Sequence, residues 1–285
     1  MGVSIAAAIA EATAKLKTQG VTAPRLEASL LLEHAIKRDR TFIIAHSEVE
    51  LSPEQSQAFE RFLARRADGE PLQYITGHQE FFKLDFEVTP DVLIPRPETE
   101  LIVETILDLF PPATPFRFAD VGTGSGCIAI SILCEREQAH ATAIDQSARA
   151  LEVARRNAAR HQVTERLRVA ESDLFTSLRR EEVFDAIVSN PPYIPEGEVA
   201  TLQREVQREP SAALAGGRDG LDVIRRLLND ALPQLKAGGY LIFEFGINQD
   251  RAILELVNRD VWELVEIRKD LQQIPRMIIL RNASC

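Results

Sequence analysis

A glycine-rich turn between an apolar strand and an apolar helix is the feature that most constrains how this 285-residue chain folds. Residues 117–121 predict a short buried strand, and residues 127–134 predict a buried helix. Glycine lets the backbone approach a ligand closely, and a helix N-terminus presents free N–H groups to it. This order is typical of a cofactor site in an α/β sheet, although such a turn can also bind nothing. The turn predicts five cofactor-binding residues: Gly122, Thr123, Gly124, Ser125 and Gly126.

The spacing of these glycines excludes three common motifs. A dinucleotide fingerprint would need its third glycine at position 127, where the chain has Cys127. No Gly-Lys-Ser/Thr sequence follows, so the turn is not the phosphate loop of a nucleoside-triphosphate enzyme. A nucleophile elbow centred on Ser125 would need glycine at position 123, where the chain has Thr123. The Asp-x-Gly-x-Gly-x-Gly pattern that begins at Asp120 instead resembles the S-adenosylmethionine loop of Rossmann-like methyltransferases.

Asp145 is a candidate ligand of the ribose. It closes the apolar run of residues 140–145, and it stands 19 residues after Gly126. At about this spacing an acidic residue reaches a ribose hydroxyl in βαβ cofactor folds. The alternative is that Asp145 caps the helix that we expect over residues 148–160, and it could do both.

Another acidic residue marks the end of the next expected strand. Residues 168–175 lie in a segment that flanks the adenine in this class of fold. We therefore predict that Asp173 accepts a hydrogen bond from the adenine amino group. Leu174 and Phe175 would form an apolar wall beside it.

Asn190-Pro191-Pro192-Tyr193 directly follows an apolar run, residues 184–189, that predicts another strand. Two consecutive prolines cannot continue a strand, because each lacks an N–H and fixes φ. The chain therefore stops at the carboxyl end of the strand, which is where open α/β sheets bind ligands. There an Asn side chain and a proline carbonyl can accept both hydrogens of a planar –NH2 group, while a Tyr ring stacks on it. The motif predicts chemistry on an amide or amino nitrogen, with a simple turn as the alternative.

These motifs, taken with three further segments, resemble the HemK/PrmC family of protein-glutamine N5-methyltransferases. The matching segments are residues 120–126 and 190–193, residues 71–77 (Pro-Leu-Gln-Tyr-Ile-Thr-Gly), residues 94–100 (Ile-Pro-Arg-Pro-Glu-Thr-Glu) and residues 209–214 (Glu-Pro-Ser-Ala-Ala-Leu). The family methylates the glutamine of the Gly-Gly-Gln motif in class I peptide chain release factors. Asn-Pro-Pro-Tyr is shared with adenine-N6 and cytosine-N4 DNA methyltransferases, whereas the segment at 94–100 is much more specific.

The resemblance implies an α/β fold and a division of the chain. Residues 98–285 would form a Rossmann-like class I methyltransferase domain with a seven-stranded mixed sheet. Residues 1–74 would form a small helical domain that recognises the substrate, and residues 75–97 a β-hairpin linker. The residues agree with this division, because residues 1–70 predict helices without a strand and the βαβ rhythm begins after Pro97.

The resemblance also assigns roles to individual residues. The catalytic and substrate-binding residues would be Asn190, Pro191, Pro192 and Tyr193. The cofactor would be S-adenosyl-L-methionine, which leaves as S-adenosyl-L-homocysteine, with Asn190 also contacting it and no metal required. Many relatives have an aromatic residue where this chain has Leu174, so an apolar contact would replace adenine stacking there.

Arg96 and Glu98 are further candidate substrate-binding residues. They lie beside the expected linker, in the segment that carries much of the resemblance. This position suits a wall of the substrate pocket. The alternative for Glu98 is that it favours a helix N-terminus through the helix dipole.

Composition narrows the class of partner. The net charge is −10 and the sequence pI is about 5.2, which argues against broad, sequence-independent binding of nucleic acid. The main competing function is that of an adenine-N6 or cytosine-N4 amino-methyltransferase that acts on a flipped base. The displaced glycine argues against a nucleotide-dependent oxidoreductase, and the intact motifs argue against a non-catalytic binding module.

The remaining signals concern location and core. The cysteines, at positions 127, 134 and 285, have no metal-binding or redox spacing, so we expect them to be reduced and buried in a cytoplasmic protein. No apolar run reaches about 18 residues, so we expect no membrane span. We expect a monomer, and we expect His34 to be a core residue on the apolar face of its helix.

Overall fold

The computed structural model describes residues 2–179 and 181–284, and the chain forms two compact units. The helical unit comprises Met1–His78 together with Gln203–Arg208. The sheet unit comprises Gln79–Leu202 and Glu209–Cys285. The hairpin that we expected as a separate linker thus belongs almost entirely to the sheet unit, and the short stretch at 203–208 was not anticipated in the helical unit.

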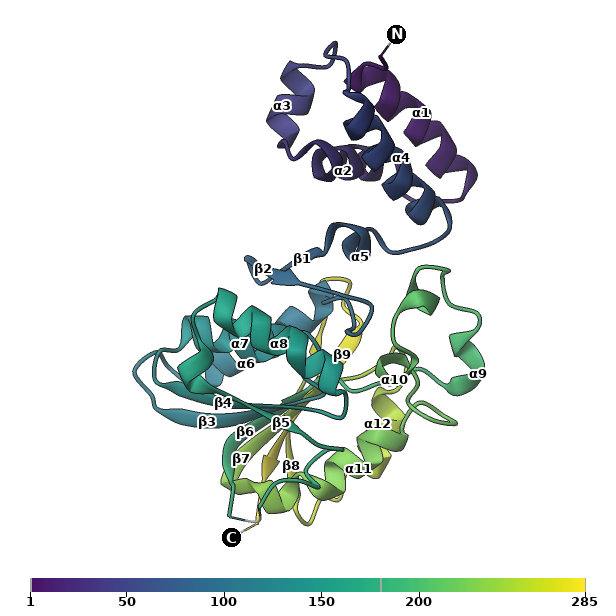
Figure 1. Ribbon diagram of the computed structural model, residues 1–285. Coiled ribbons are helices and arrows are strands. Elements are labelled where there is room, and N and C mark those ends of the chain that lie inside the picture. The colour runs from purple at the N-terminus through teal and green to yellow at the C-terminus, as the bar shows by residue number, and fades with distance from the viewer. Residues whose placement is uncertain (1, 180, 285) are drawn as a thin grey trace. The chain divides into compact units, whose positions relative to one another are not determined.

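Within its described residues, the helical unit contains five helices (Figure 1): α1 (Ile5–Thr18), α2 (Pro24–Ile36), α3 (Arg40–Ala45), α4 (Pro53–Ala67) and α5 (Leu72–Thr76). Side chains cap three of them. Ser52 and Gln55 form a reciprocal capping box at the start of α4, and Ser4 and Asp39 accept backbone N–H groups at the starts of α1 and α3. Because such short helices are marginal alone, the apolar faces of α1, α2 and α4 stabilise them by packing on one another.

A buried arginine ties residues 203–208 to the helical unit. Arg66, on α4, is only 3% exposed, and its Nε lies 2.5 Å from a carboxylate oxygen of Glu27 on α2. Its Nη2 lies 2.6 Å from a carboxylate oxygen of Glu205. Arg208 adds a more exposed ion pair to Asp68 at 2.7 Å. Charge pairing of a buried guanidinium therefore fixes a segment that the chain supplies about 139 residues later.

The hairpin consists of β1 (His78–Phe81) and β2 (Leu84–Glu87). Its two turn residues, Phe82 and Lys83, both have positive φ, which matches the twist of a two-residue hairpin. Phe81 and Phe86 are fully buried in a core cluster of the sheet unit. The hairpin is thereby anchored by its aromatic side chains.

The sheet unit is built on a seven-stranded mixed sheet, as predicted. The strand order is β5-β4-β3-β6-β7-β9-β8, in which β9 runs antiparallel to both of its neighbours and the other pairs are parallel. The strands are β3 (Phe116–Val121), β4 (Ala139–Asp145), β5 (Leu167–Glu171), β6 (Phe184–Ser189), β7 (Leu235–Glu244), β8 (Trp262–Lys269) and β9 (Pro275–Asn282). The chain leaves β3 toward β4 on one side and later returns to β6 on the other. The strand order therefore reverses between β3 and β6, and ligands bind at the carboxyl ends of strands at such a point.

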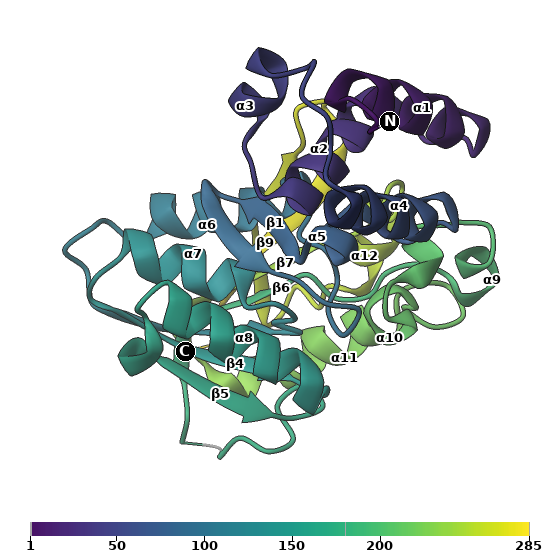
Figure 2. The same ribbon diagram turned by 45° about the horizontal axis from the view of Figure 1, so that its top comes forward.

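Helices cover both faces of this sheet, so its central strands are buried almost continuously. Figures 1 and 2 show α6, α7 and α8 on one face and α11 and α12 on the other. The helices of the sheet unit are α6 (Glu100–Leu109), α7 (Cys127–Glu135), α8 (Ala148–Arg160), α9 (Glu196–Val199), α10 (Ser211–Leu214), α11 (Asp222–Asp230) and α12 (Asp250–Leu256). Short 3-10 turns are η1 (Pro97–Thr99), η2 (Thr164–Arg166), η3 (Val206–Arg208, in the helical unit) and η4 (Leu232–Gln234).

Two expectations about buried residues are wrong in part. Cys127 is buried, but Cys134 is exposed because it lies near the end of α7; Cys285 is outside the described residues. His34 is exposed on α2 rather than part of the core. The prediction was wrong because helical periodicity defines an apolar face without showing which residues cover it. None of the helices in the described residues is long and apolar enough to cross a membrane.

Candidate active site

The candidate site is a cavity of about 360 Å³ at the carboxyl edge of the sheet. In the parallel register, Val121 at the end of β3 pairs with Ile144 of β4 and with Ser189 of β6. The three loops that leave these strands therefore begin side by side. They bring together Gly122, Thr123, Gly124 and Ser125 of the glycine turn, Asp145 at the end of β4 and Asn190 after β6, all of which line the cavity. Gly126, which was also predicted to bind the cofactor, is packed instead, because a Cβ there would lie 2.9 Å from Cδ1 of Ile130.

The glycine turn adopts a backbone conformation that favours glycine at three of its positions. Gly122, Gly124 and Gly126 all have positive φ, between 55° and 82°, which glycine adopts without strain. A Cβ at Gly124 would meet no atom within 4 Å, so the turn faces open space there. A Cβ at Gly122 would lie 3.9 Å from the backbone oxygen of Asn190. The turn is therefore open toward the cavity, and one of its glycines lies next to Asn190.

Asp120 holds the turn from beneath. Its Oδ2 accepts a hydrogen bond from the Thr123 hydroxyl at 2.6 Å and another from the backbone N–H of Ala129. Complete burial raises the pKa of Asp120 to about 7, against the lowering effect of these two donors. Among the described residues, the buried Oδ1 of Asp120 has no hydrogen-bond partner. A buried carboxyl group with an unpaired oxygen lowers the stability of the fold, and groups with such strongly shifted pKa values cluster at functional sites.

Asp145 lines the cavity, and it does not cap α8. The N-cap of α8 is Ser147, whose hydroxyl accepts from the backbone of Ala150. The Asp145 carboxylate instead accepts from the backbone N–H groups of Gly124 and Ser147, both at 2.9 Å. Burial raises its pKa above the usual value. The carboxylate thus bridges the glycine turn and the start of α8, and the alternative of an N-cap role is wrong.

The expected adenine end carries one residue that sequence reasoning missed. Asp173 and Leu174 both line the cavity, and Asp173 pairs with Arg226 of α11 at 2.9 Å. Leu174 is buried and has a φ of 50°, a strained value for a side chain without a local hydrogen-bonding group. Phe175, which we expected in the wall, lies in the same buried core cluster as Leu174, but it is not among the described residues that line the cavity. Arg226 also lines the cavity, but its exposed position on a helix gave no signal in the sequence.

The Asn-Pro-Pro-Tyr motif, residues 190–193, contains the predicted acceptors of the –NH2 hydrogens, and it is called the acceptor motif for that reason. Asn190, Pro191 and Pro192 line the cavity. Tyr193 packs against the core, and its hydroxyl donates to Glu244 at 3.0 Å. Burial, together with Glu244, raises the pKa of Tyr193 well above its ordinary value, so the hydroxyl stays protonated.

Thr99 and Glu244 adjoin this motif, and sequence reasoning assigned neither a role. The Asn190 Nδ2 donates to the Thr99 hydroxyl at 2.9 Å, and that hydroxyl donates to Glu244 Oε2 at 2.6 Å. Burial raises the pKa of Glu244 to about 6, while its hydroxyl donors lower it. The sequence held a signal for Glu244, because it is the lone acid in the apolar run of residues 241–245.

Arg96 and Glu98, which we predicted together, have different surroundings. Arg96 lines the cavity and pairs through Nη2 with Glu209 at 2.5 Å. Glu209 also accepts from the backbone N–H of Ile94 at 3.0 Å, so it fastens the segment at residues 94–96. Glu98 acts instead on Glu244, whose pKa its charge raises. Glu209 was also missed, although it lies in the matching segment at 209–214. The substrate-binding roles of Arg96 and Glu98 stay predictions.

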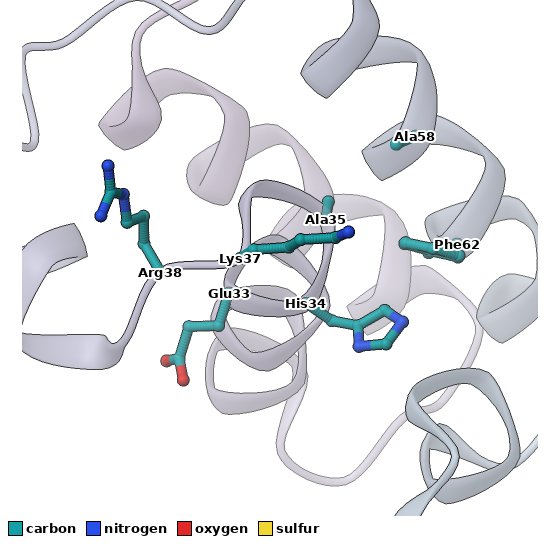
Figure 3. Close-up of a pocket in the computed structure, with 7 residues that line it drawn as sticks. All are labelled: Glu33, His34, Ala35, Lys37, Arg38, Ala58 and Phe62. Atoms are coloured by element: carbon teal, nitrogen blue, oxygen red, sulfur yellow. The ribbon is translucent and has the colours of Figure 1, made fainter.

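A second, more open cavity lies within the helical unit, between α2 and α4. Its lining includes His34, whose ring centroid is 4.9 Å from that of Phe62. Figure 3 shows Lys37 extending toward Phe62, whereas Glu33 and Arg38 point away from it. The mixture of exposed ring, cation and alanine side chains gives the helical unit a hollow with apolar walls and charged edges.

Comparisons with known proteins agree across the chain. A model described as the PrmC N-terminal domain matches residues 7–77, and one described as the methyltransferase small domain matches residues 98–217. A curated release factor glutamine methyltransferase from Koribacter versatilis is 42% identical over 270 residues, covering 94% of this chain and 95% of that protein. Another, from Nitratidesulfovibrio vulgaris, is 43% identical over 271 residues, covering 94% and 92%.

Solved structures of low sequence identity share the fold. The hMettl16 catalytic domain, crystallised in complex with a 3′UTR hairpin, has a TM-score of 0.59 and 18% identity. The match covers 79% of this chain and 82% of that one. At this identity the likeness establishes a Rossmann-like methyltransferase fold.

Proposed function

The chain belongs to the family of release factor glutamine methyltransferases, and we propose that it methylates the N5 amide nitrogen of the glutamine in the Gly-Gly-Gln motif of class I peptide chain release factors. The methyl donor is S-adenosyl-L-methionine, and S-adenosyl-L-homocysteine is the product. One observation carries the proposal beyond family membership. The glycine turn, Asp145 and Asn190 line a single cavity, which supports a cofactor site with an acceptor for –NH2 hydrogens beside it.

The residues present fit S-adenosylmethionine. The cavity, at about 360 Å³, falls within the range of about 300–1,000 Å³ that is usual for small-molecule sites. Gly122 and Gly124 leave the turn open to a close ligand, and the Asp145 carboxylate retains lone pairs for ribose hydroxyls beyond its two backbone donors. Asp173 would accept from the adenine amino group, and Leu174 would supply an apolar contact. When bound, the cofactor supplies an electrophilic methyl group on a sulfonium.

The acceptor residues must overcome the poor nucleophilicity of an amide. The lone pair of the glutamine nitrogen is delocalised into its carbonyl. Asn190 Oδ1 and the Pro191 carbonyl would accept the two amide hydrogens and orient the nitrogen, so that positioning supplies much of the acceleration. Tyr193 would support the amide plane. Pro192 and the other apolar residues of the wall would exclude water, which would favour a reaction that neutralises charge.

The helical unit would contribute to recognition of the protein substrate. It matches the PrmC N-terminal domain over almost its whole length, and its exposed hollow beside Phe62 is a surface on which a protein segment could pack. In the sheet unit, Arg96 and Glu98 would also contribute to binding the substrate. Release factors act on ribosomes, so the proposed location is the cytoplasm. A monomer suffices, because one chain supplies every residue of the cavity.

Methyl transfer from radiolabelled S-adenosylmethionine tests this function. The purified chain would be incubated with a bacterial class I release factor, with the same factor carrying Gln→Ala in Gly-Gly-Gln, and with duplex DNA. We expect label in the first substrate alone. Label in DNA would favour an amino-methyltransferase of nucleic acid, and equal labelling of both release factors would show that another residue is the acceptor.

A further inference from the structure

A buried carboxylate behind the cavity is joined by hydrogen bonds to both polar side chains of the acceptor motif. Glu244, at the end of β7, and Thr99, before α6, are each 2% exposed. One oxygen of Glu244 accepts from Thr99, which in turn accepts from Asn190. The other oxygen accepts from Tyr193. A single group thus stands at the root of two branches.

The direction of these hydrogen bonds matters because an asparagine amide has two similar ends. Oδ1 can accept a substrate N–H, whereas Nδ2 can only repel it. The hydroxyl of Thr99 has one proton, and at 2.6 Å it is committed to Glu244. Its oxygen can therefore only accept from Asn190, which requires Nδ2 on that side. Oδ1 is left as the end of the amide that is available to the substrate.

An ionised carboxylate is the one partner that enforces this order on both branches. It accepts on both oxygens and donates on neither. If Glu244 carried a proton, one branch would face a donor, and a reversed Thr99 hydroxyl would turn Asn190 Oδ1 away from the substrate. The geometry is thus sensitive to the charge of a group that does not contact the substrate.

We propose that Glu244, acting through Thr99, is a positioning residue that sets which end of the Asn190 amide faces the glutamine. The proposal rests on the function proposed above and adds to it the group that determines the polarity of the acceptor site. Tyr193 is oriented by the same carboxylate. Neither Glu244 nor Thr99 exchanges a proton with the substrate in this account.

The charges around Glu244 give the proposal a pH signature. Burial raises its pKa to about 6, the Thr99 and Tyr193 hydroxyls lower it, the nearby Glu98 raises it, and Arg276 of β9 lowers it. Arg276 is itself held by Asp270 at 3.0 Å. Since the ionised form is the one that orders the network, turnover should be full well above pH 6 and should fall as the pH drops through about 6.

The first test compares threonine variants of the full chain with the release factor as substrate. Thr99→Val removes the hydroxyl at nearly constant shape, and we expect kcat to fall about 10- to 100-fold, as when other orienting partners are removed. Thr99→Ser keeps the hydroxyl and should therefore restore most of the kcat that Thr99→Val loses. The matched control is Thr105→Val, because Thr105 is a similarly buried threonine of α6 whose hydroxyl donates to the Leu101 carbonyl. Calorimetry should show S-adenosylmethionine affinity unchanged in all three variants.

The second test is the pH profile of kcat, which stays informative if Thr99→Val fails to fold. Wild type should show an acid limb near pH 6, and Glu244→Gln should be slower and should lack that limb. An identical limb in both proteins, or a Thr99→Val variant that is folded and as fast as wild type, would overturn the proposal. Wild-type turnover is measured in the same assay: if it is absent, the proposed function fails, whereas wild-type turnover with indifferent variants overturns only this inference.

Discussion

Two buried charged side chains, Arg66 in the helical unit and Glu244 in the sheet unit, have opposite kinds of partner: charged for Arg66 and neutral for Glu244. In the helical unit, the Arg66 guanidinium lies between the carboxylates of Glu27 and Glu205, at 2.5 and 2.6 Å. In the sheet unit, the carboxylate of Glu244 is just as buried, but its hydrogen-bond donors are the neutral hydroxyls of Thr99 and Tyr193. Burial accordingly raises the pKa of Glu244 to about 6.

The partners of the two buried charges indicate different roles, one structural and one in the candidate active site. A buried cation with two anionic partners has its desolvation offset, and it serves to fix chain segments that are distant in sequence. A buried acid that receives only neutral donors keeps a large part of its desolvation cost, and such groups are typical of functional sites. Asp120 beneath the glycine turn follows the second pattern, with its pKa raised by burial to about 7. Both buried acids, Asp120 and Glu244, lie near the carboxyl ends of their strands, at the edge of the sheet that carries the cavity.

Truncating Asn190 should give the largest effect on turnover. A small effect would contradict a functional role for the carboxyl edge of the sheet. We expect Asn190→Ala to lower kcat by about 10²–10³-fold, because a preorganised polar contact to the reacting group is lost. Affinity for S-adenosylmethionine should stay close to wild type. Single-turnover kinetics and titration calorimetry measure the two quantities. Asn258→Ala, on an exposed loop after α12, is the matched control. A large loss of cofactor affinity would contradict this division of roles.

Removing the buried cation should instead affect stability. We expect Arg66→Ala to lower the free energy of unfolding by about 3 kcal/mol, because it leaves two carboxylates without their shared partner. The control is Arg65→Ala at the preceding residue, which removes a more exposed ion pair with Glu70. It should lower the free energy of unfolding by under about 1 kcal/mol. Urea denaturation followed by circular dichroism gives both values. Equal losses would mean that burial of the Arg66 cluster has no energetic consequence.

The pH dependence of stability isolates the buried acid. The native pKa of Glu244, about 6, is above its ordinary value of 4.5, so between these values the native state binds more protons than the unfolded state. The free energy of unfolding contributed by this group therefore falls as pH rises from 4.5 to 6, by about 2 kcal/mol. Glu244→Gln should lack that contribution, so its stability relative to wild type should increase over this interval. A constant difference between the two denaturation series would show that burial of Glu244 does not perturb its titration.

The smallest expected effect concerns the exposed ion pair between Asp173 and Arg226, which both line the cavity. Asp173 and Arg226 are about half exposed, so Asp173→Ala should change the free energy of unfolding by under about 1 kcal/mol. If Asp173 also accepts from the adenine, affinity for S-adenosylmethionine should fall about 3- to 10-fold. Calorimetry against Asp230→Ala, an exposed acid at the end of α11, measures the difference. Unchanged affinity would remove Asp173 from the cofactor site.

What the sequence predicts well here is what local patterns determine. The helix at α8 (Ala148–Arg160) and the strand at β6 (Phe184–Ser189) have the expected bounds, and the glycine turn joins a strand to a helix as expected. Stop signals such as two prolines or three glycines act within a few residues. They are sufficient to bring the cofactor turn and the acceptor motif to the same edge of the sheet, since parallel strands share their carboxyl ends.

What the sequence does not predict depends on distant pairings. Thr99 meets Glu244 across 145 residues, and Arg66 meets Glu205 across 139. A helical or strand period gives no register for such contacts. The same limit explains why the prediction for His34 was wrong: the apolar stripe on its helix does not show which neighbours cover it, and His34 is exposed. The acid inside the apolar run at β7 was the one local sign of the network.

Tandem mass spectrometry of a release factor incubated with the chain and methyl-deuterated S-adenosylmethionine tests the central claim most directly. We predict one labelled methyl group on the side-chain nitrogen of the Gly-Gly-Gln glutamine, and labelling about 10²–10³-fold slower when Asn190→Ala replaces wild type. A labelled methyl group on any other residue, or an unlabelled glutamine beside consumed cofactor, would contradict the account.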